Sequence, residues 1–331
     1  MARGEGVAVK MRELRRAVQL FVLAFSVLAA PMVCAAEWPA APIHIIVPFT
    51  PGASTDIVVR TIAPKLSELL GTGVVVENRG RAGGLIATEA GAVAKPDGYT
   101  LLVVTTSFAA QPAIMEKLPY DTLKDFAPIA LIADLPGVLV INPGVPVKTF
   151  AELLAYAKSH PLTYGSAGVG TFPHLGIELL KSRAKIPLTQ VPYKGAAQAL
   201  TDVIAGHVDL KLDAYVSANA HIADGSLRAL AVSSLTRLPE LPDVPTIAES
   251  GFPGFEVTYW IGVVAPVAIP DPVRARLQKA FAESLTPQNR ASLAKGGVRP
   301  LGEGSDALQS LIGRELDQWT KLAKETDLTI K

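Results

Sequence analysis

The strongest constraint on the fold is a regular alternation of short apolar runs with longer amphipathic segments, which begins at residue 42. An apolar run over residues 43–47 leads through a turn to residues 56–70, where apolar side chains recur at helical spacing. Residues 74–77 and 99–104 are the next two apolar runs. Strands that alternate with helices in this way form a largely parallel sheet, so the sequence predicts an α/β fold.

The alternation pauses and then resumes, which predicts two similar lobes. Apolar runs at residues 126–133 and 137–141 separate the first series from the second. At 331 residues the chain is long enough for about two domains, and we expect each lobe to hold a mainly parallel sheet flanked by helices. The second series predicts helices at 150–159, 173–183 and 196–205, strands at 162–164, 188–191, 208–213 and 227–232, an extended segment at 256–265, and closing helices at 271–285 and 306–325.

The first 36 residues have the features of a secretory signal peptide. Five basic residues stand in the first 16 positions, and an apolar run and a group of small residues follow. The run is shorter than the roughly 20 residues that a transmembrane helix needs. We expect cleavage near Ala36 and export. The paired Arg15 and Arg16 leave the twin-arginine route open, while an uncleaved anchor and lipid attachment at Cys34 are the less favoured alternatives.

The charge balance of the remaining chain excludes several classes of function. Without residues 1–36, 26 basic and 28 acidic residues remain, and no cysteine. A nucleic-acid-binding protein normally shows a basic excess, which is absent here. The histidines have no metal-ligand spacing, and neither a Walker A loop nor a dinucleotide-binding fingerprint occurs. We therefore predict no metal, no cofactor and no nucleic-acid partner.

Two glycine-containing loops stand where open α/β sheets bind their ligands, at the carboxyl ends of strands. Residues 48–56 link the first predicted strand to a helix, and residues 165–171 do the same in the second series. Gly52 permits a close approach of the backbone, and Thr171 is a candidate helix cap. Free N–H groups at helix starts attract anions. The pair of loops predicts an anion site, with ordinary capped turns as the alternative, and its donors are expected to be neutral because neither loop contains an arginine.

The second loop also permits one enzymatic alternative, a hydrolase built from Ser166, His174 and an aspartate. The segment Gly165-Ser-Ala-Gly168 lacks the glycine two residues before the serine that a nucleophile elbow requires. We therefore predict a binding protein and no enzyme, and we keep a secreted α/β hydrolase of small esters, using the same cleft, as the alternative.

A series of motifs, in order, resembles the Bug receptors, the periplasmic solute-binding proteins of tripartite tricarboxylate transporters. The motifs are PFTPGASTD at 48–56, VENR at 76–79, AGG at 82–84, KPDGYTL at 95–101, LPYD at 118–121, YGSAGVGT at 164–171 with His174 and Leu175, VPYKG at 191–195, LRALAV at 227–232 and LPDVPT at 241–246. The resemblance covers essentially all of the chain after Glu37. It implies a type II periplasmic-binding-protein fold with a ligand cleft between the lobes.

The resemblance also implies how the chain is divided and what it does. Lobe 1 would contain residues 37–136 and 257–331, and lobe 2 residues 137–256. The protein would capture a small organic acid in the periplasm and deliver it to the membrane permease subunits of its transporter. We expect a monomer whose lobes close by hinges near residues 133–137 and 256–260. The ligand itself is not identified by the resemblance.

The ligand-binding positions that the resemblance implies lie in the first loop, after the third strand, and in lobe 2. They are Phe49, Thr50, Gly52, Ala53, Ser54, Thr55, Asp56, Thr105, Thr106, Ser107, Ser166, Gly170, Thr171, His174, Tyr193 and Asp213, with Lys194 nearby.

Two positions depart from the family pattern. Ala53 stands where a second glycine is usual, and Lys211 stands where an apolar residue is expected. Alternate residues of a strand share one face, so Lys211 lies on the same face as Asp209 and Asp213. We favour an ion pair on that face over a contact between Lys211 and the ligand.

Overall fold

The computed structural model describes residues 38–80 and 84–326. The α/β fold is one compact unit that begins at residue 41. The predicted signal peptide lies outside the described residues. Among the helices of the described part, none is both long and apolar enough to cross a membrane.

The first sheet is built around a buried β1 strand. In β1 every residue except His44 is fully buried, and its parallel neighbours on either side are β2 and β3. The spatial order is β2 (Val74–Asn78), β1 (Ile43–Val47), β3 (Thr100–Thr105), β9 (Thr258–Pro266), β4 (Phe126–Ile141) and β10 (Arg299–Gly304). From β3 onward the neighbouring strands are antiparallel.

The second sheet shares β4 with the first. Its order is β8 (Arg228–Val232), β4, β7 (Leu210–Ala214), β5 (Leu162–Ser166) and β6 (Leu188–Pro192). β5 is parallel to both of its neighbours, whereas β7 and β8 are antiparallel to β4. Parallel pairs therefore occupy one end of each sheet, and every pair that includes β4 or β9 is antiparallel.

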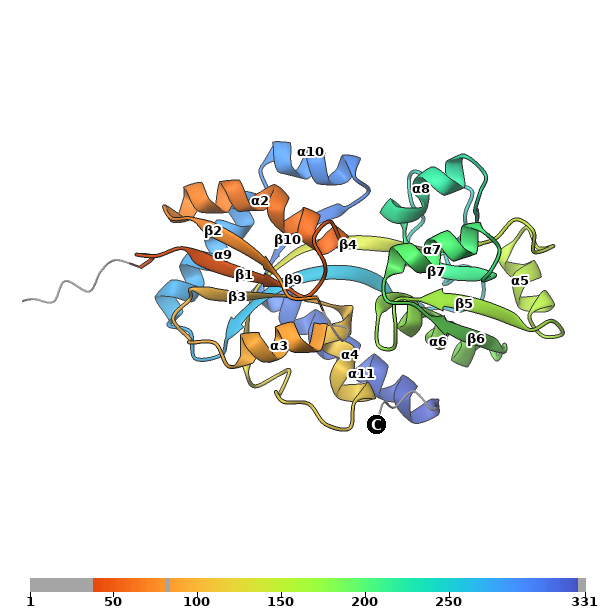
Figure 1. Cartoon of the computed structure of the whole chain (residues 1–331), viewed down its shortest axis with the longest axis horizontal. Coiled ribbons are helices and arrows are strands. Elements are labelled where there is room, and N and C mark those ends of the chain that lie inside the picture. The colour runs from red at the N-terminus through yellow and green to blue at the C-terminus, as the bar shows by residue number, and fades with distance from the viewer. Residues whose placement is uncertain (1–37, 81–83, 327–331) are drawn as a thin grey trace, which may run out of the picture. The chain divides into compact units, whose positions relative to one another are not determined.

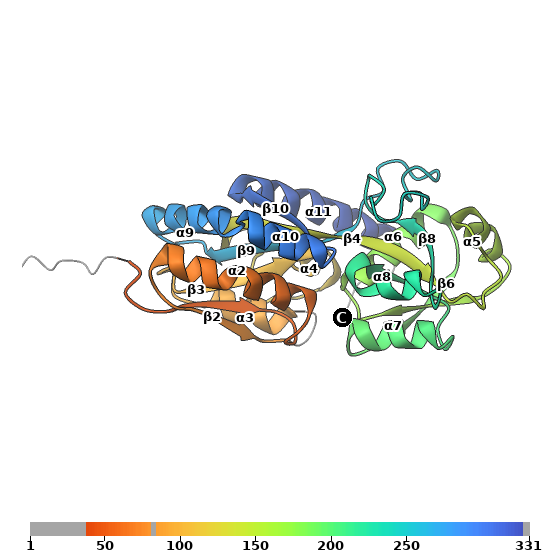
Figure 2. The same ribbon diagram turned by 90° about the horizontal axis from the view of Figure 1, so that it is seen from above.

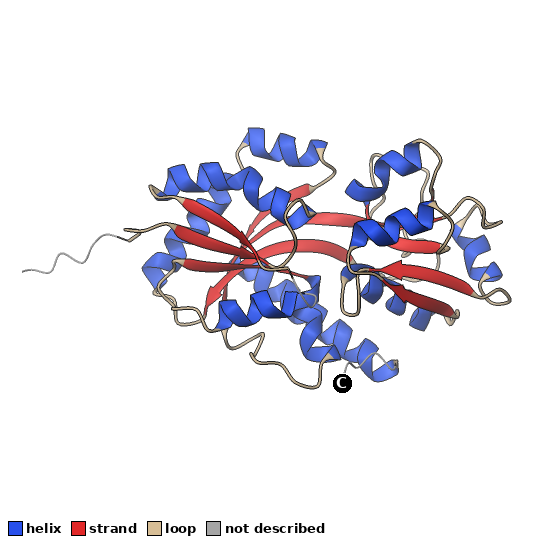
Figure 3. Cartoon of the chain, viewed as in Figure 1, coloured by secondary structure: helices blue, strands red, loops and turns tan. Residues whose placement is uncertain are grey.

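The long strand β4 carries the chain from one sheet to the other. It pairs with β9 up to Pro136, and with β7 and β8 from Gly137 onward. In Figures 1 and 3, β4 and β9 run side by side between the two groups of elements. The sequence pattern predicts two separate runs here, and the structure joins them into one strand of 16 residues.

Helices cover both faces of the first sheet. α3 (Leu85–Ala92), α4 (Thr106–Ile114) and α11 (Ser305–Glu325) supply apolar side chains to a core with Leu102, Val104 and Trp260. α2 (Ser54–Leu70) packs against α9 (Asp271–Ser284) and α10 (Pro287–Lys295). α2 ends at Gly71, whose left-handed conformation and N–H bond to Ser67 O close the helix.

The second sheet has an apolar core on each of its two faces. α5 (Phe150–Tyr156) and α6 (Phe172–Ala184) cover one face, and α7 (Ala196–Ile204) and α8 (Tyr215–Ala223) cover the other. Trp319 and Leu322 of α11 belong to the core beneath α5 and α6, so this last helix packs on both halves of the fold. Figure 2 shows α11 extending along β4 toward α6.

Candidate functional site

Tyr259, near the start of β9, brings together elements that are far apart in the sequence. Its hydroxyl shares a 2.8 Å hydrogen bond with the Thr55 hydroxyl and a further hydrogen bond with Thr105. Its ring lies 6.1 Å from the ring of Phe49 and 5.9 Å from that of Phe172. Burial raises the pKa of the Tyr259 phenol, so the group keeps its proton and can donate a hydrogen bond.

The first loop is held in place by the side chain of Asp56. One carboxylate oxygen accepts from Gly52 N at 2.9 Å, and the other accepts from Arg60 Nε at 2.8 Å and Asn78 Nδ2 at 2.9 Å. Burial alone would raise the pKa of Asp56, but these donors outweigh it and the pKa is lowered. Asp56 is therefore ionised, paired with Arg60, and occupied in shaping the loop.

The rest of the first loop is more open to solvent. Thr50 and Gly52 are exposed, Phe49, Ala53 and Ser54 are half-buried, and Thr55 is fully buried. Gly52 has φ +81°, a conformation that other residues rarely adopt. Ala53 occupies the cap position of α2 in an extended conformation without a side-chain cap bond.

The start of α4 supplies the next predicted positions. Thr105, Thr106 and Ser107 are all buried. Thr106 donates its hydroxyl to Thr258 O at 2.8 Å, next to Tyr259. Together with the Thr105 bond to Tyr259, this contact ties the end of β3 to the start of β9.

The second loop is ordered by its own hydrogen bonds. Ser166 is completely buried, and its hydroxyl accepts from Gly168 N at 3.2 Å and from Gln190 Nε2 at 2.8 Å. Thr171 donates its hydroxyl to Gly168 O at 2.6 Å, so it stands at the cap position of α6 but does not cap with its side chain. A Cβ at Gly170 would lie 2.6 Å from Ile114 Cδ1, which places this loop against α4.

His174 is neutral in this loop. Its Nδ1 accepts a hydrogen bond from Gly170 N at 3.2 Å, which a protonated imidazole cannot do. Burial lowers the pKa of His174 to about 4, with Glu178 opposing the shift and Lys181 adding to it. The ring therefore acts as a structural acceptor for the loop.

Two predicted positions are engaged elsewhere in the second half. Tyr193 donates its hydroxyl to Asp202 at 2.7 Å, and burial together with Asp202 raises its pKa to about 12. Asp213 lies 2.7 Å from Lys211 Nζ and accepts from Ala214 N at 2.9 Å. The predicted ion pair of Lys211 is thus confirmed for Asp213, whereas Asp209 instead accepts from Thr163.

The structure therefore gathers only part of the predicted set. Phe49, Thr55 and Thr105 meet at Tyr259, and the second loop approaches through Phe172. The residues at this point offer hydroxyl groups without a cation of their own, since the nearby Arg60 is paired with Asp56. Such an arrangement suits a small anion that accepts several neutral hydrogen bonds.

The fold is that of the two-lobed periplasmic binding proteins. The structure of the periplasmic binding protein BugD matches with a TM-score of 0.80 and 35% identity, over 89% of this chain and 100% of that one. The family model described as "Tripartite tricarboxylate transporter family receptor" matches residues 58–328. Protein BugT of Bordetella pertussis is 35% identical over 330 residues, which cover 98% of this chain and 100% of BugT. The chain belongs to the tripartite tricarboxylate transporter receptor family.

Two similar structures contain small acids. R. palustris Rpa4515 with adipate has a TM-score of 0.80 and 35% identity, over 87% of this chain and 98% of that one. MatC from Rhodopseudomonas palustris with bound malate has a TM-score of 0.78 and 33% identity, over 86% and 99%. Nothing in these comparisons supports the hydrolase alternative.

Proposed function

We propose that this protein is a periplasmic receptor that captures a small carboxylate beside Tyr259 and delivers it to the permease of a tripartite tricarboxylate transporter. The observation that carries the proposal is the convergence of Phe49, Thr55, Thr105 and Phe172 on one tyrosine. The adipate and malate held by similar proteins support a carboxylate as the ligand class. The chain acts by binding, not by catalysis.

The electrostatics of the site support an acid held by neutral donors. Tyr259 keeps its proton, and its single O–H can donate to a carboxylate oxygen while Thr55 and Thr105 donate to the phenol oxygen. The ionised Asp56 would repel an acid, but Arg60 balances its charge at 2.8 Å. Hydrogen bonds to a charged group are worth about 1.5–3 kcal/mol each, so a few such donors suffice for tight binding.

We further propose that the ligand closes lobe 1, residues 37–136 and 257–331, onto lobe 2, residues 137–256. The change of partners in β4 at Pro136 and Gly137 supports this division. An acid shifts the protein to a closed state only if it binds that state more tightly, which requires contacts with both lobes. Tyr259 contacts Thr55 of the first loop and Phe172, which follows the second loop, so a ligand beside it would contact both lobes.

Tyr259→Phe should weaken binding of the acid by about 10- to 100-fold, because it removes one hydrogen bond to a charged group. Thr55→Val should weaken it less, since Tyr259 keeps its hydroxyl and its bond to Thr105. The acid is first chosen by thermal-shift screening of organic acids that include adipate and malate, and affinities are then measured by titration calorimetry. Tyr156→Phe, a half-buried tyrosine on α5, is the matched control and should bind normally. If Tyr259→Phe binds as tightly as the wild type, the carboxylate does not lie at this tyrosine.

A further inference from the structure

A second cavity lies on the opposite face of β9 from Tyr259. Glu256, Thr258 and Trp260 line it, and they alternate along the chain with Val257 and Tyr259, which point to the other side. Its walls also include Asp134 of β4, residues of β10, and one face of α11. The cavity has a volume of about 490 Å³, within the usual range of small-molecule sites. None of the positions predicted to bind the acid lines it.

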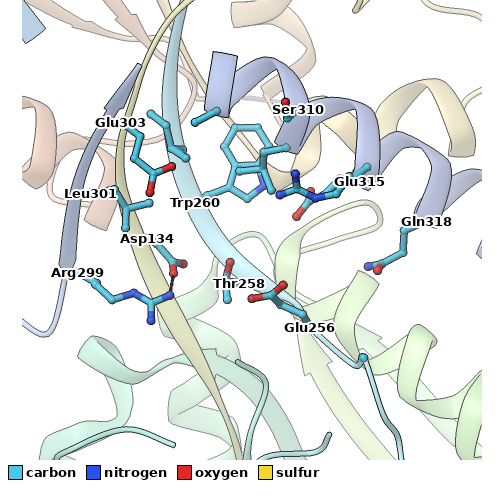
Figure 4. A pocket seen from close by; sticks show the side chains of 15 residues that line it. Asp134, Glu256, Thr258, Trp260, Arg299, Leu301, Glu303, Ser310, Glu315 and Gln318 are labelled. Carbon is cyan, nitrogen blue, oxygen red and sulfur yellow. Dashed lines mark hydrogen bonds and ion pairs between the residues drawn. The ribbon is translucent and has the colours of Figure 1, made fainter. Parts of the chain in front are cut away.

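The lining of this cavity is rich in carboxylates. Figure 4 shows Asp134, Glu256, Glu303 and Glu315 around Trp260 and Thr258. Among the described residues, two cationic side chains line the same space, Arg299 and Arg314. Glu315, whose pKa is raised to about 8, is mostly protonated at pH 7, so three carboxylates face two arginines and the cavity favours a positively charged occupant.

The carboxylates are close enough to repel one another. Burial raises the pKa of Glu256, and the charge of Asp134 raises it further, while Arg299 and Arg314 oppose the shift. Burial raises the pKa of Glu315 to about 8, the indoles of Trp260 and Trp319 oppose this shift, and repulsion from Glu256 and Asp134 adds to it. The two arginines leave part of this repulsion uncompensated.

One carboxylate oxygen is left without a partner. Asp134 is 3% exposed, and Arg299 donates to its Oδ2. Its Oδ1 is buried and has no hydrogen-bond partner among residues 38–80 and 84–326. A buried carboxylate oxygen is costly to leave unpaired, so this atom marks where a donor from a ligand would fit.

The spacing of the acids favours an organic cation over a metal ion. Within the described part of the chain, no group of three or more His, Cys, Asp or Glu side chains could hold a metal ion. A larger cation can reach carboxylates that are too far apart to share one ion. Apolar groups of Leu131, Leu301 and Leu311 on the same walls suit the methylene chain of such a molecule.

We propose that this cavity between β4, β9, β10 and α11 binds a small organic cation that carries amino groups. One ammonium group donates to Asp134 Oδ1, and a second lies among Glu256 and Glu303. Charge-assisted hydrogen bonds of this kind are stronger than neutral ones. The site is separate from the proposed carboxylate site.

The test is a calorimetric titration of the purified protein with 1,4-diaminobutane at low ionic strength, with the neutral 1,4-butanediol as the matched ligand. We expect saturable binding of one diamine and no binding of the diol. Glu256→Gln and Asp134→Asn should each weaken diamine binding at least tenfold. Glu240→Gln, which removes an exposed carboxylate outside the cavity, should bind like the wild type. The titration contains no carboxylate ligand, so its outcome does not depend on the proposed receptor function.

Melting curves accompany each variant, and Glu256 is the primary test because this residue is less buried than Asp134 and its replacement by glutamine is conservative. The proposal is overturned if the wild type shows no saturable binding, or if the diol binds as tightly as the diamine. It is equally overturned if a folded Glu256→Gln protein binds normally, or if Glu240→Gln weakens binding as much as Glu256→Gln does.

Discussion

Lys211→Met should lower the free energy of unfolding by about 3–5 kcal/mol, because it leaves the Asp213 carboxylate buried without its partner. Lys211 Nζ lies 2.7 Å from Asp213 Oδ2, and the two side chains are 0% and 6% exposed. Burial lowers the pKa of Lys211, and the attraction of Asp213 opposes that shift. Urea unfolding at pH 7, followed by circular dichroism, measures the change.

Two further variants separate the loss of charge pairing from the loss of packing. Lys65→Met removes the ion pair between Lys65 and Glu68. Their side chains are 30% and 69% exposed, so the free energy of unfolding should fall by less than about 1 kcal/mol. The double variant Lys211→Met with Asp213→Asn removes both buried charges and should recover most of the stability. If the double variant is as unstable as Lys211→Met alone, the unpaired carboxylate is not the cause.

Lowering the pH from 7 to 4 should reduce the free energy of unfolding of the wild type by about 3 kcal/mol more than that of His174→Asn. The pKa of His174 is lowered from 6.5 to about 4 by burial. The unfolded chain therefore takes up a proton as the pH falls through 6.5, whereas the folded protein does so only near pH 4. The stability that neutral His174 provides is complete above pH 6.5 and is lost progressively between pH 6.5 and 4.

Asparagine suits this comparison because its side-chain oxygen can replace Nδ1 as the acceptor for Gly170 N. Unfolding free energies of both proteins are measured in urea at several pH values, and the difference between them isolates the imidazole from the carboxylates that also titrate. His207→Asn changes an exposed histidine, keeps His174, and should lose stability as the wild type does. A constant difference between wild type and His174→Asn over the whole range would contradict the argument.

The local sequence pattern predicts most of the helices and strands of the fold. The predicted helix at residues 56–70 corresponds to α2, and the closing helix at 306–325 corresponds to α11. β10 was missed because its sequence, RPLGEG, has neither apolar alternation nor high strand propensity, and its pairing with β4 alone makes it a strand. α4 and α8 were missed because each follows a strand without an intervening loop.

Tyr259 could not be recognised as the centre of the candidate site from the sequence. The sequence pointed to this residue only through the predicted hinge at 256–260, which contains it. Its contacts depend on β9 lying between β3 and β4, a pairing across more than 100 residues. The loop motifs did identify Thr55 and Thr105, the two residues that hydrogen-bond to it.

Asp213 and Tyr193 illustrate the opposite difficulty. Both lie near the carboxyl ends of second-lobe strands, where ligands bind in this fold class. Their polar atoms are engaged by Lys211 and Asp202. Lys211 and Asp213 are two residues apart on one strand face, so their ion pair could be predicted from the sequence. The hydrogen bond from Tyr193 to Asp202 of α7 could not, because it depends on how that helix packs.

The most direct test of the carboxylate receptor is calorimetric titration of the wild-type protein with the acid that stabilises it most in the thermal-shift screen, beside the methyl ester of that acid. A ligand at about 100 times its dissociation constant stabilises a protein by roughly 2.7 kcal/mol, which the screen readily detects. The acid should bind at a single site and at least about 100-fold more tightly than the ester, because esterification removes charge-assisted hydrogen bonds. Equal affinity for the acid and the ester, or no binding of any carboxylate in the panel, would contradict the proposed function.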